Sequence, residues 1–152
     1  MKITRALLGC LLFTASVFAG PNFSGDWKLN LSKSDFGSMP APDKLTMKID
    51  HKDPALKVES IQVGQQGEVK GESNYTTDGK ESKNKFRNNE MVSKVKWDGA
   101  ALTFDSKLDF QGNEVLLKDN WSVSEDGKTL TIKRKFSAPQ GEFESVQVLE
   151  KQ

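Results

Sequence analysis

Two ionisable side chains fall at positions that a folded chain should turn toward its interior. Asp119 and Arg134 each stand in a segment where apolar and polar residues alternate, and each takes the apolar phase of that alternation. An isolated buried charge costs several kcal/mol, so the two residues are expected to form an ion pair. The pair could be structural, or Arg134 could bind the carboxylate of a ligand inside a cavity.

The other reactive residue types are too few to form a catalytic or metal-binding group. His51 is the only histidine, and the stretch "DHKDPA", with Pro54 in its turn, predicts a solvated turn residue. The single cysteine, Cys10, lies in an N-terminal segment that we expect to be removed, so neither a zinc site nor a Ser–His–acid triad is expected. We therefore expect no enzyme, no metal and no cofactor; an isomerase or cyclase working in a pocket is the less favoured alternative.

Most of the chain beyond residue 43 repeats one pattern of alternating segments joined by Asp-Gly dipeptides. Asp-Gly occurs at 78–79, 98–99 and 126–127, each time between two segments with period-two alternation. The dipeptide suits a two-residue hairpin turn, because both central positions need a positive φ that Gly adopts freely and Asp tolerates. The pattern predicts three antiparallel hairpins.

The two later hairpins can be given a register. A turn at the second dipeptide would place Val95 opposite Leu102, and a turn at the third would place Asp119 opposite Arg134. In both hairpins the apolar residues of the two strands then share one face. A slip of one residue would turn one apolar set outward, so the hydrophobic pattern supports these registers.

The alternation and the turns together predict an all-β chain of about ten strands. The expected strands are 23–30, 44–50, 55–63, 67–77, 80–87, 90–97, 100–110, 113–123, 128–137 and 142–150. Their apolar faces must be covered, either by curling into an up-and-down barrel or by stacking as two sheets. We favour an antiparallel up-and-down meander closing into a barrel of about 8 to 10 strands, because closure removes exposed edges.

The connection 31–43 is the exception to short links between strands. Its glycine and its two prolines prevent much regular structure. Ser32, with Asp35 three residues later, could cap one helical turn there.

The first nineteen residues have the pattern of a secretion signal. Lys2 and Arg5 precede the apolar run "ALLGCLLFTASVFA", which ends in small residues. We expect cleavage after Ala19 and a periplasmic or secreted protein, with 20–152 as a single domain. The run is too short for a convincing membrane span. A lipoprotein signal, with lipid attached to Cys10 in "LLGC", is the alternative.

The stretch "FSGDWKLN" at 23–30 resembles the first-strand signature of the calycins, which include the lipocalins and the fatty-acid-binding proteins. The resemblance implies that Trp27 of the Gly-x-Trp motif plugs one end of a lipocalin-like barrel. It also implies a structural lock of Gly25, Trp27 and a basic residue from a late strand, here Arg134 in "TLTIKRKF". Fatty-acid-binding proteins carry a helix-turn-helix between their first two strands, for which 31–43 is too short. An exported bacterial lipocalin-like protein is the closer description.

These observations predict an exported, non-enzymatic protein that binds a small hydrophobic or amphipathic, lipid-like molecule in a barrel cavity. Serines recur on the expected inward face, at positions 60, 73, 93 and 106, which indicates a wet interior. The candidate ligand-binding residues are Arg134, Asp119, Trp97, Trp121, Tyr75 and Phe104.

The alternative is a module for protein–protein interaction or inhibition, built on a solid-core barrel or a β-sandwich. The formal net charge of the chain is +1, which gives no reason to expect nucleic acid or an anionic membrane surface as a partner. We expect a monomer.

Overall fold

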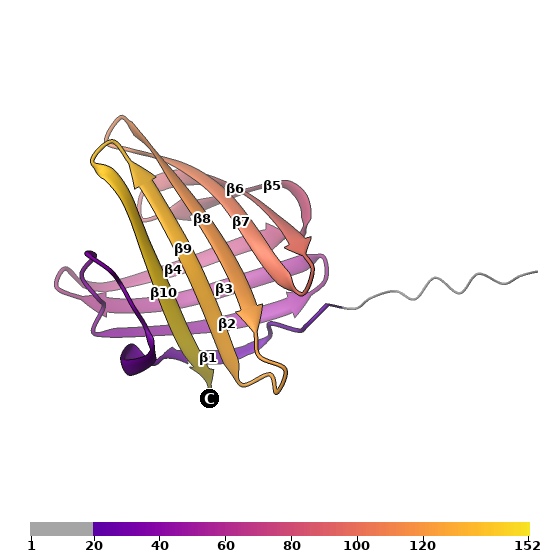
Figure 1. Ribbon diagram of the computed structural model, residues 1–152. Helices are drawn as coiled ribbons and strands as arrows, with labels where there is room; N and C mark the ends of the chain where they lie inside the picture. The colour runs from indigo at the N-terminus through magenta and orange to yellow at the C-terminus, as the bar shows by residue number, and fades with distance from the viewer. Residues whose placement is uncertain (1–19) are drawn as a thin grey trace, which may run out of the picture.

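Ten antiparallel strands make up nearly all of the regular structure in the computed structural model, which describes residues 20–152 (Figure 1). They are β1 (Gly25–Leu29), β2 (Lys44–Lys52), β3 (Ala55–Gly64), β4 (Gly67–Thr76), β5 (Asp78–Phe86), β6 (Asn89–Asp98), β7 (Ala101–Phe110), β8 (Asn113–Val123), β9 (Thr129–Ala138) and β10 (Gly141–Lys151). The expected secretion signal and Cys10 lie outside the described residues. Among residues 20–152, no helix has the length and apolar character needed to cross a membrane.

The strands form one sheet in the order β4-β3-β2-β1-β10-β9-β8-β7-β6-β5. Neighbours in sequence are neighbours in the sheet, except for β4 and β5, which form its two edges. The one pairing between strands that are not adjacent in sequence joins β1 to β10. In Figure 1 the strands β1–β4 run across β6–β10, so the sheet curls around a shared interior. The prediction of an all-β up-and-down barrel is confirmed, and the barrel is nearly closed.

The barrel has one seam, between the two edge strands β4 and β5. The first Asp-Gly, at 78–79, was expected to join these strands in a hairpin, and this expectation is wrong, because they lie at opposite ends of the sheet order. Side chains cross the seam where a backbone ladder would otherwise run. Asn84 of β5 bonds to the backbone of Asn74, and the Ser82 hydroxyl accepts the N–H of Thr76 at 3.2 Å.

The register of the β6–β7 hairpin differs from the expected one by two residues. Val95 pairs with Phe104 rather than with Leu102, because the two turn residues are Gly99 and Ala100. Gly99 has a φ of +59°, which suits the first central position of a type II′ turn. A shift of two residues keeps every side chain on its expected face. The β8–β9 register is confirmed.

The connection between β1 and β2 holds a single turn of 3-10 helix, η1 (Leu31–Lys33). Its cap is Asn30, whose Oδ1 accepts the N–H of Lys33, and not Ser32 as expected. The chain then runs beside β10, where Asp35 forms an isolated antiparallel bridge with Val146. The part of β10 that extends past the end of β1 is therefore paired with this connection instead.

The apolar core fills one end of the barrel, which we call the closed end. The segment before β1 crosses there, and its Phe23 is fully buried. The main core comprises Phe23, Trp27, Leu29, Leu45, Met47, Ile49, Leu56, Val58, Val95, Leu102, Phe104, Trp121, Leu130, Ile132 and Leu149. A smaller cluster of Met91, Leu108 and Val115 lies toward the opposite end, which we call the open end.

Candidate functional site

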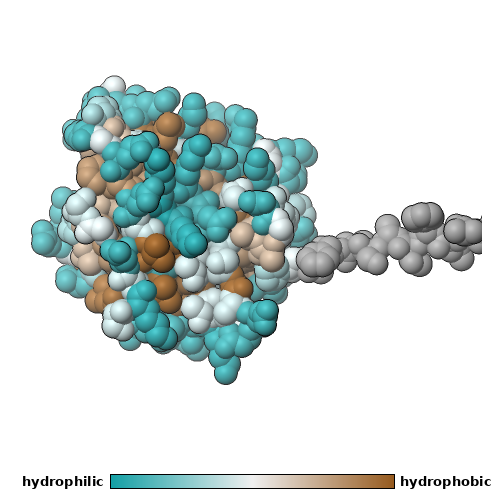
Figure 2. Space-filling model, viewed as in Figure 1, coloured by the Kyte–Doolittle hydropathy of each residue, from teal (hydrophilic) through white to brown (hydrophobic). Residues whose placement is uncertain are grey.

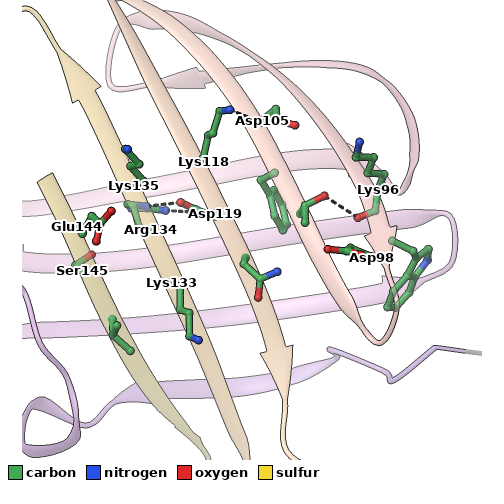
Figure 3. A pocket seen from close by; sticks show the side chains of 15 residues that line it. Lys96, Asp98, Asp105, Lys118, Asp119, Lys133, Arg134, Lys135, Glu144 and Ser145 are labelled. Carbon is green, nitrogen blue, oxygen red and sulfur yellow. Dashed lines mark hydrogen bonds and ion pairs between the residues drawn. The ribbon is translucent and has the colours of Figure 1, made fainter. Parts of the chain in front are cut away.

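Arg134 and Asp119 form an ion pair inside the barrel, as the sequence predicted. They face each other across β9 and β8, and Figure 3 shows their side chains pointing toward one another. Arg134 Nε donates to Asp119 Oδ1 at 2.8 Å, and Nη2 donates to Oδ2 at 2.6 Å. The carboxylate raises the pKa of Arg134, so the guanidinium stays charged. The Asp119 side chain is 7% exposed, whereas that of Arg134 is 35% exposed.

Three aromatic side chains stack beside this pair. Tyr75 meets Phe104 edge to face with ring centroids 5.3 Å apart, and Phe104 lies 4.4 Å from Trp121. The Trp121 Nε1–H donates to Asp119 Oδ2 at 3.3 Å, which links the aromatic row to the ion pair. Burial raises the pKa of Tyr75, so its hydroxyl keeps its proton near neutral pH.

Ser145 is a site residue that the sequence did not indicate. It is the β10 partner of Arg134, it is buried, and its Oγ has no hydrogen-bond partner among the described residues. A buried hydroxyl without a partner is uncommon and calls for an explanation. The alternation of apolar and polar residues in "EFESVQVLE" could have indicated that Ser145 faces inward. No Asp-Gly turn precedes this strand, so its register could not be assigned from the sequence. The inward serines Ser93 and Ser106, by contrast, bond to each other at 2.7 Å.

Inward-facing side chains toward the open end keep some solvent exposure, unlike those of the closed end. This partly exposed set is Ser73, Tyr75, Leu117, Arg134, Phe136 and Phe143. The rings of Phe136 and Phe143 lie 6.1 Å apart on neighbouring strands. The candidate site is therefore the group of Tyr75, Phe104, Asp119, Trp121, Arg134 and Ser145, bordered by apolar side chains that water reaches.

Trp97 does not join the other predicted site residues. Its Nε1–H donates to Asp53 Oδ1 at 3.0 Å, and its ring lies 6.0 Å from Phe23 and 5.7 Å from His51. It also contacts Gly20, where a Cβ atom would come within 2.6 Å of the indole. Trp97 thus packs on the N-terminal segment at the closed end.

His51 is buried in β2, so the expectation of a solvated turn residue is wrong. The N-terminal segment covers it: Nδ1 accepts the N–H of Phe23 at 3.3 Å, and Ser24 bonds to the His51 backbone. Nε2 lies 3.5 Å from Asp53 Oδ1. Among residues 20–152, no group of three or more His, Cys, Asp and Glu residues is arranged to hold a metal ion.

The cation over Trp27 is Lys151 and not Arg134, whose expected place in the lock is wrong. Lys151 pairs with Trp27 in the sheet, and its Nζ lies 5.4 Å from the ring centroid. Arg134 faces Ser145, six residues earlier on β10, which is about 20 Å along the strand. Gly25 also lies against Lys151, since a Cβ there would come within 2.5 Å of the Lys151 side chain.

The outer face of β6–β10 carries a groove of about 740 Å³. Charged side chains of both signs line it, including Lys96, Lys118, Lys133 and Glu144 (Figure 3). The site residues Phe104, Asp119, Arg134 and Ser145 also belong to its lining. In the same view, Figure 2 shows a face that is largely hydrophilic with small hydrophobic patches.

Several solved structures share this architecture. An SAHS (secretory abundant heat soluble) protein from Ramazzottius varieornatus aligns with a TM-score of 0.67 and 16% identity, covering 88% of this chain and 98% of that one. Zebrafish ileal bile acid-binding protein, complexed with cholic acid, aligns at 0.61 and 18% identity over 86% and 98%. Fatty-acid-binding protein 1 of Echinococcus granulosus aligns at 0.54 and 16% identity over 85% and 96%.

No protein-family model and no curated protein matches the sequence. The likeness to known proteins is therefore one of three-dimensional structure, and at these identities it concerns the fold. The chain thus has an up-and-down β-barrel fold that is similar to the fold of these solved structures, a fatty-acid-binding protein among them.

Proposed function

We propose that this protein binds a small amphipathic, lipid-like molecule inside the barrel, near its open end, without catalysing a reaction. The polar end of the ligand would meet Arg134, Asp119 and Ser145, and its apolar part would lie along Leu117 and Phe136. The observation that carries the proposal is the buried Ser145 hydroxyl, which lacks a partner beside the partly exposed Arg134. Such polar groups at one end of an apolar surface suit an amphipathic ligand.

The structural neighbours support this proposal by analogy. One is a bile acid-binding protein with cholic acid and another is a fatty-acid-binding protein, and both share the barrel of this chain. Both are binding proteins by name, in agreement with a non-enzymatic role. Fold alone does not determine function, so the inward site carries the argument and the analogy adds to it.

Titration with medium-chain amphiphiles tests the proposal. Trp121 is buried in the candidate site, so binding should change tryptophan fluorescence. A ligand at 100 times its Kd adds about 2.7 kcal/mol to the free energy of unfolding, so the melting temperature should also rise. A panel of alcohols, acids and sterol-like molecules that changes neither quantity would overturn the proposal.

Two variants locate the binding. Phe136→Ala removes an inward aromatic ring at the open end and should weaken binding. Ile61→Ala is the matched control, because Ile61 is 37% exposed on the outward side of β3 and should leave binding unchanged. Equal loss in both variants would place the ligand elsewhere.

We also propose that the protein is exported and acts as a monomer. The charged start, apolar run and small residues of the first nineteen positions support cleavage after Ala19. Expression in a bacterium, fractionation and intact-mass measurement test this: the product outside the cytoplasm should begin at Gly20. A product with its full mass in the cytoplasm would contradict export, and a lipid mass on Cys10 would favour the lipoprotein alternative.

Protein–protein interaction is the second candidate function. The large outer groove with walls of both charges favours it, since paired charges are common in protein interfaces. If this candidate is correct, Lys133→Glu in the groove should abolish capture of a partner, while the amphiphiles above should have no effect.

A further inference from the structure

The ion pair at the centre of the candidate site is already neutral. Both Asp119 oxygens accept hydrogen bonds from Arg134, and Oδ2 also receives the Trp121 Nε1–H. Two parallel N–H···O bonds are the strongest form of this pairing. The guanidinium charge is therefore matched inside the barrel before any ligand enters.

Among residues 20–152, a ligand carboxylate would find no unpaired cation in this part of the barrel. Among the inward-facing positions of the described strands, the other cation is Lys151, which lies over Trp27 at the closed end. A carboxylate beside Arg134 would also face the like charge of Asp119. Burying an anion without an unpaired cation is strongly unfavourable.

The site nevertheless offers hydrogen bonds to an uncharged oxygen. Arg134 has five N–H groups, and Asp119 accepts hydrogen bonds from its Nε and Nη2. Ser145 Oγ, opposite Arg134 and without a partner, can donate and accept. Tyr75 is near enough for the charges of the pair to act on its pKa, and it remains a donor.

We propose that the polar end of the ligand is a neutral oxygen group, such as a hydroxyl or an ester carbonyl, and not a free carboxylate. The neutral oxygen accepts from Arg134 and exchanges a hydrogen bond with Ser145, which gives that hydroxyl its missing partner. This inference rests on the proposed function and names the class of ligand that the same site takes.

Three ligands with the same chain test this inference: 1-dodecanol, methyl dodecanoate and sodium dodecanoate. At pH 8, where the acid is ionised, the alcohol or the ester should bind at least tenfold more tightly than dodecanoate. As the pH falls through the pKa of the acid, dodecanoic acid should gain affinity while the alcohol stays constant. Dodecanoate binding as tightly as the two neutral ligands at pH 8 would overturn the inference.

The Asp119→Asn variant gives a second, independent readout. It keeps the shape of the side chain but frees the Arg134 charge, so the preference should reverse and dodecanoate should gain at least tenfold. Asp50→Asn is the matched control, because Asp50 is exposed on β2 and should change no affinity. Circular dichroism checks that each variant is folded. If Asp119→Asn does not fold, the pH series on the wild-type protein tests the inference by itself.

The outcomes separate this inference from the proposed function. If neither alcohol, ester nor acid binds, the proposed function fails. If all bind and the ionised acid binds best, the barrel is a ligand carrier and the inference about a neutral group is wrong. A loss of alcohol binding in Ser145→Ala, with dodecanoate binding unchanged, would identify the Ser145 hydroxyl as the contact.

Discussion

The side chain of Asn84 takes the place of a strand peptide opposite Asn74. Its Oδ1 accepts the Asn74 N–H at 2.8 Å, and its Nδ2 donates to the Asn74 carbonyl oxygen at 3.0 Å. Two backbone groups of an edge strand are thereby satisfied without a ladder. The seam of the barrel is therefore held by side chains, which single substitutions can remove.

Asn84→Ala should open this seam locally. Loss of the two hydrogen bonds should lower the free energy of unfolding by about 1 kcal/mol. Hydrogen exchange of the Asn74 amide should become faster, because no acceptor replaces Oδ1. Lys85→Ala, one residue along and exposed, is the control. Unchanged exchange at Asn74 would show that the side chain contributes little.

Arg134→Ala should leave the Asp119 carboxylate buried without its partner. Removing one member of a buried pair costs about 3–5 kcal/mol, and the 35% exposure of Arg134 places the expected loss near the lower limit. Urea unfolding at neutral pH measures this loss. The double variant with Asp119→Asn should recover part of it, because no unpaired charge remains. Absence of any recovery would mean that packing, and not charge, sets the cost.

Phe23→Ala should show that the segment before β1 belongs to the core. The ring is fully buried against Trp97 and His51, and truncation of a buried Phe costs about 3–5 kcal/mol. Leu31→Ala, at a side chain that is 46% exposed, should cost under about 0.5 kcal/mol. Equal melting temperatures for the two variants would contradict the role of this segment.

Asp53 should contribute to the acid sensitivity of the fold. The Thr77 hydroxyl, with help from the Trp97 indole, lowers the pKa of Asp53 below its ordinary value of 3.8. A carboxylate with a depressed pKa stabilises the fold above its unfolded pKa, and this contribution is lost as the pH falls through the folded pKa. Urea midpoints between pH 5 and pH 2 should therefore fall more steeply in wild type than in Asp53→Asn. Parallel profiles would exclude this contribution.

Local patterns were sufficient to predict the strands and the central ion pair. Alternation and Asp-Gly turns gave ten strands, and the β8–β9 hairpin placed Asp119 opposite Arg134 because both lie within one short-range unit. The β6–β7 register moved by two residues because a turn with Gly first is as acceptable as one with Asp-Gly at its centre. Each side chain still lies on the face that was expected, because side chains along a strand alternate with a period of two residues.

Contacts between distant segments could not be predicted in the same way. Lys151 lies over Trp27 because β1 pairs with β10, and no local signal sets that register. His51 is buried because residues of the N-terminal segment cross over it. Ser145 is a different case, because β9 and β10 form a local hairpin whose turn has no Asp-Gly dipeptide to indicate its register. Long-range contacts therefore decide the positions of Lys151 and His51, whereas Ser145 lacked a recognisable turn signal.

The pairing of β1 with β10 also has a consequence for the order of events in a cell. The first strand acquires its second neighbour only after β10 has left the ribosome, so the sheet cannot close at β1 until all ten strands have been made. Contacts between such distant segments slow folding.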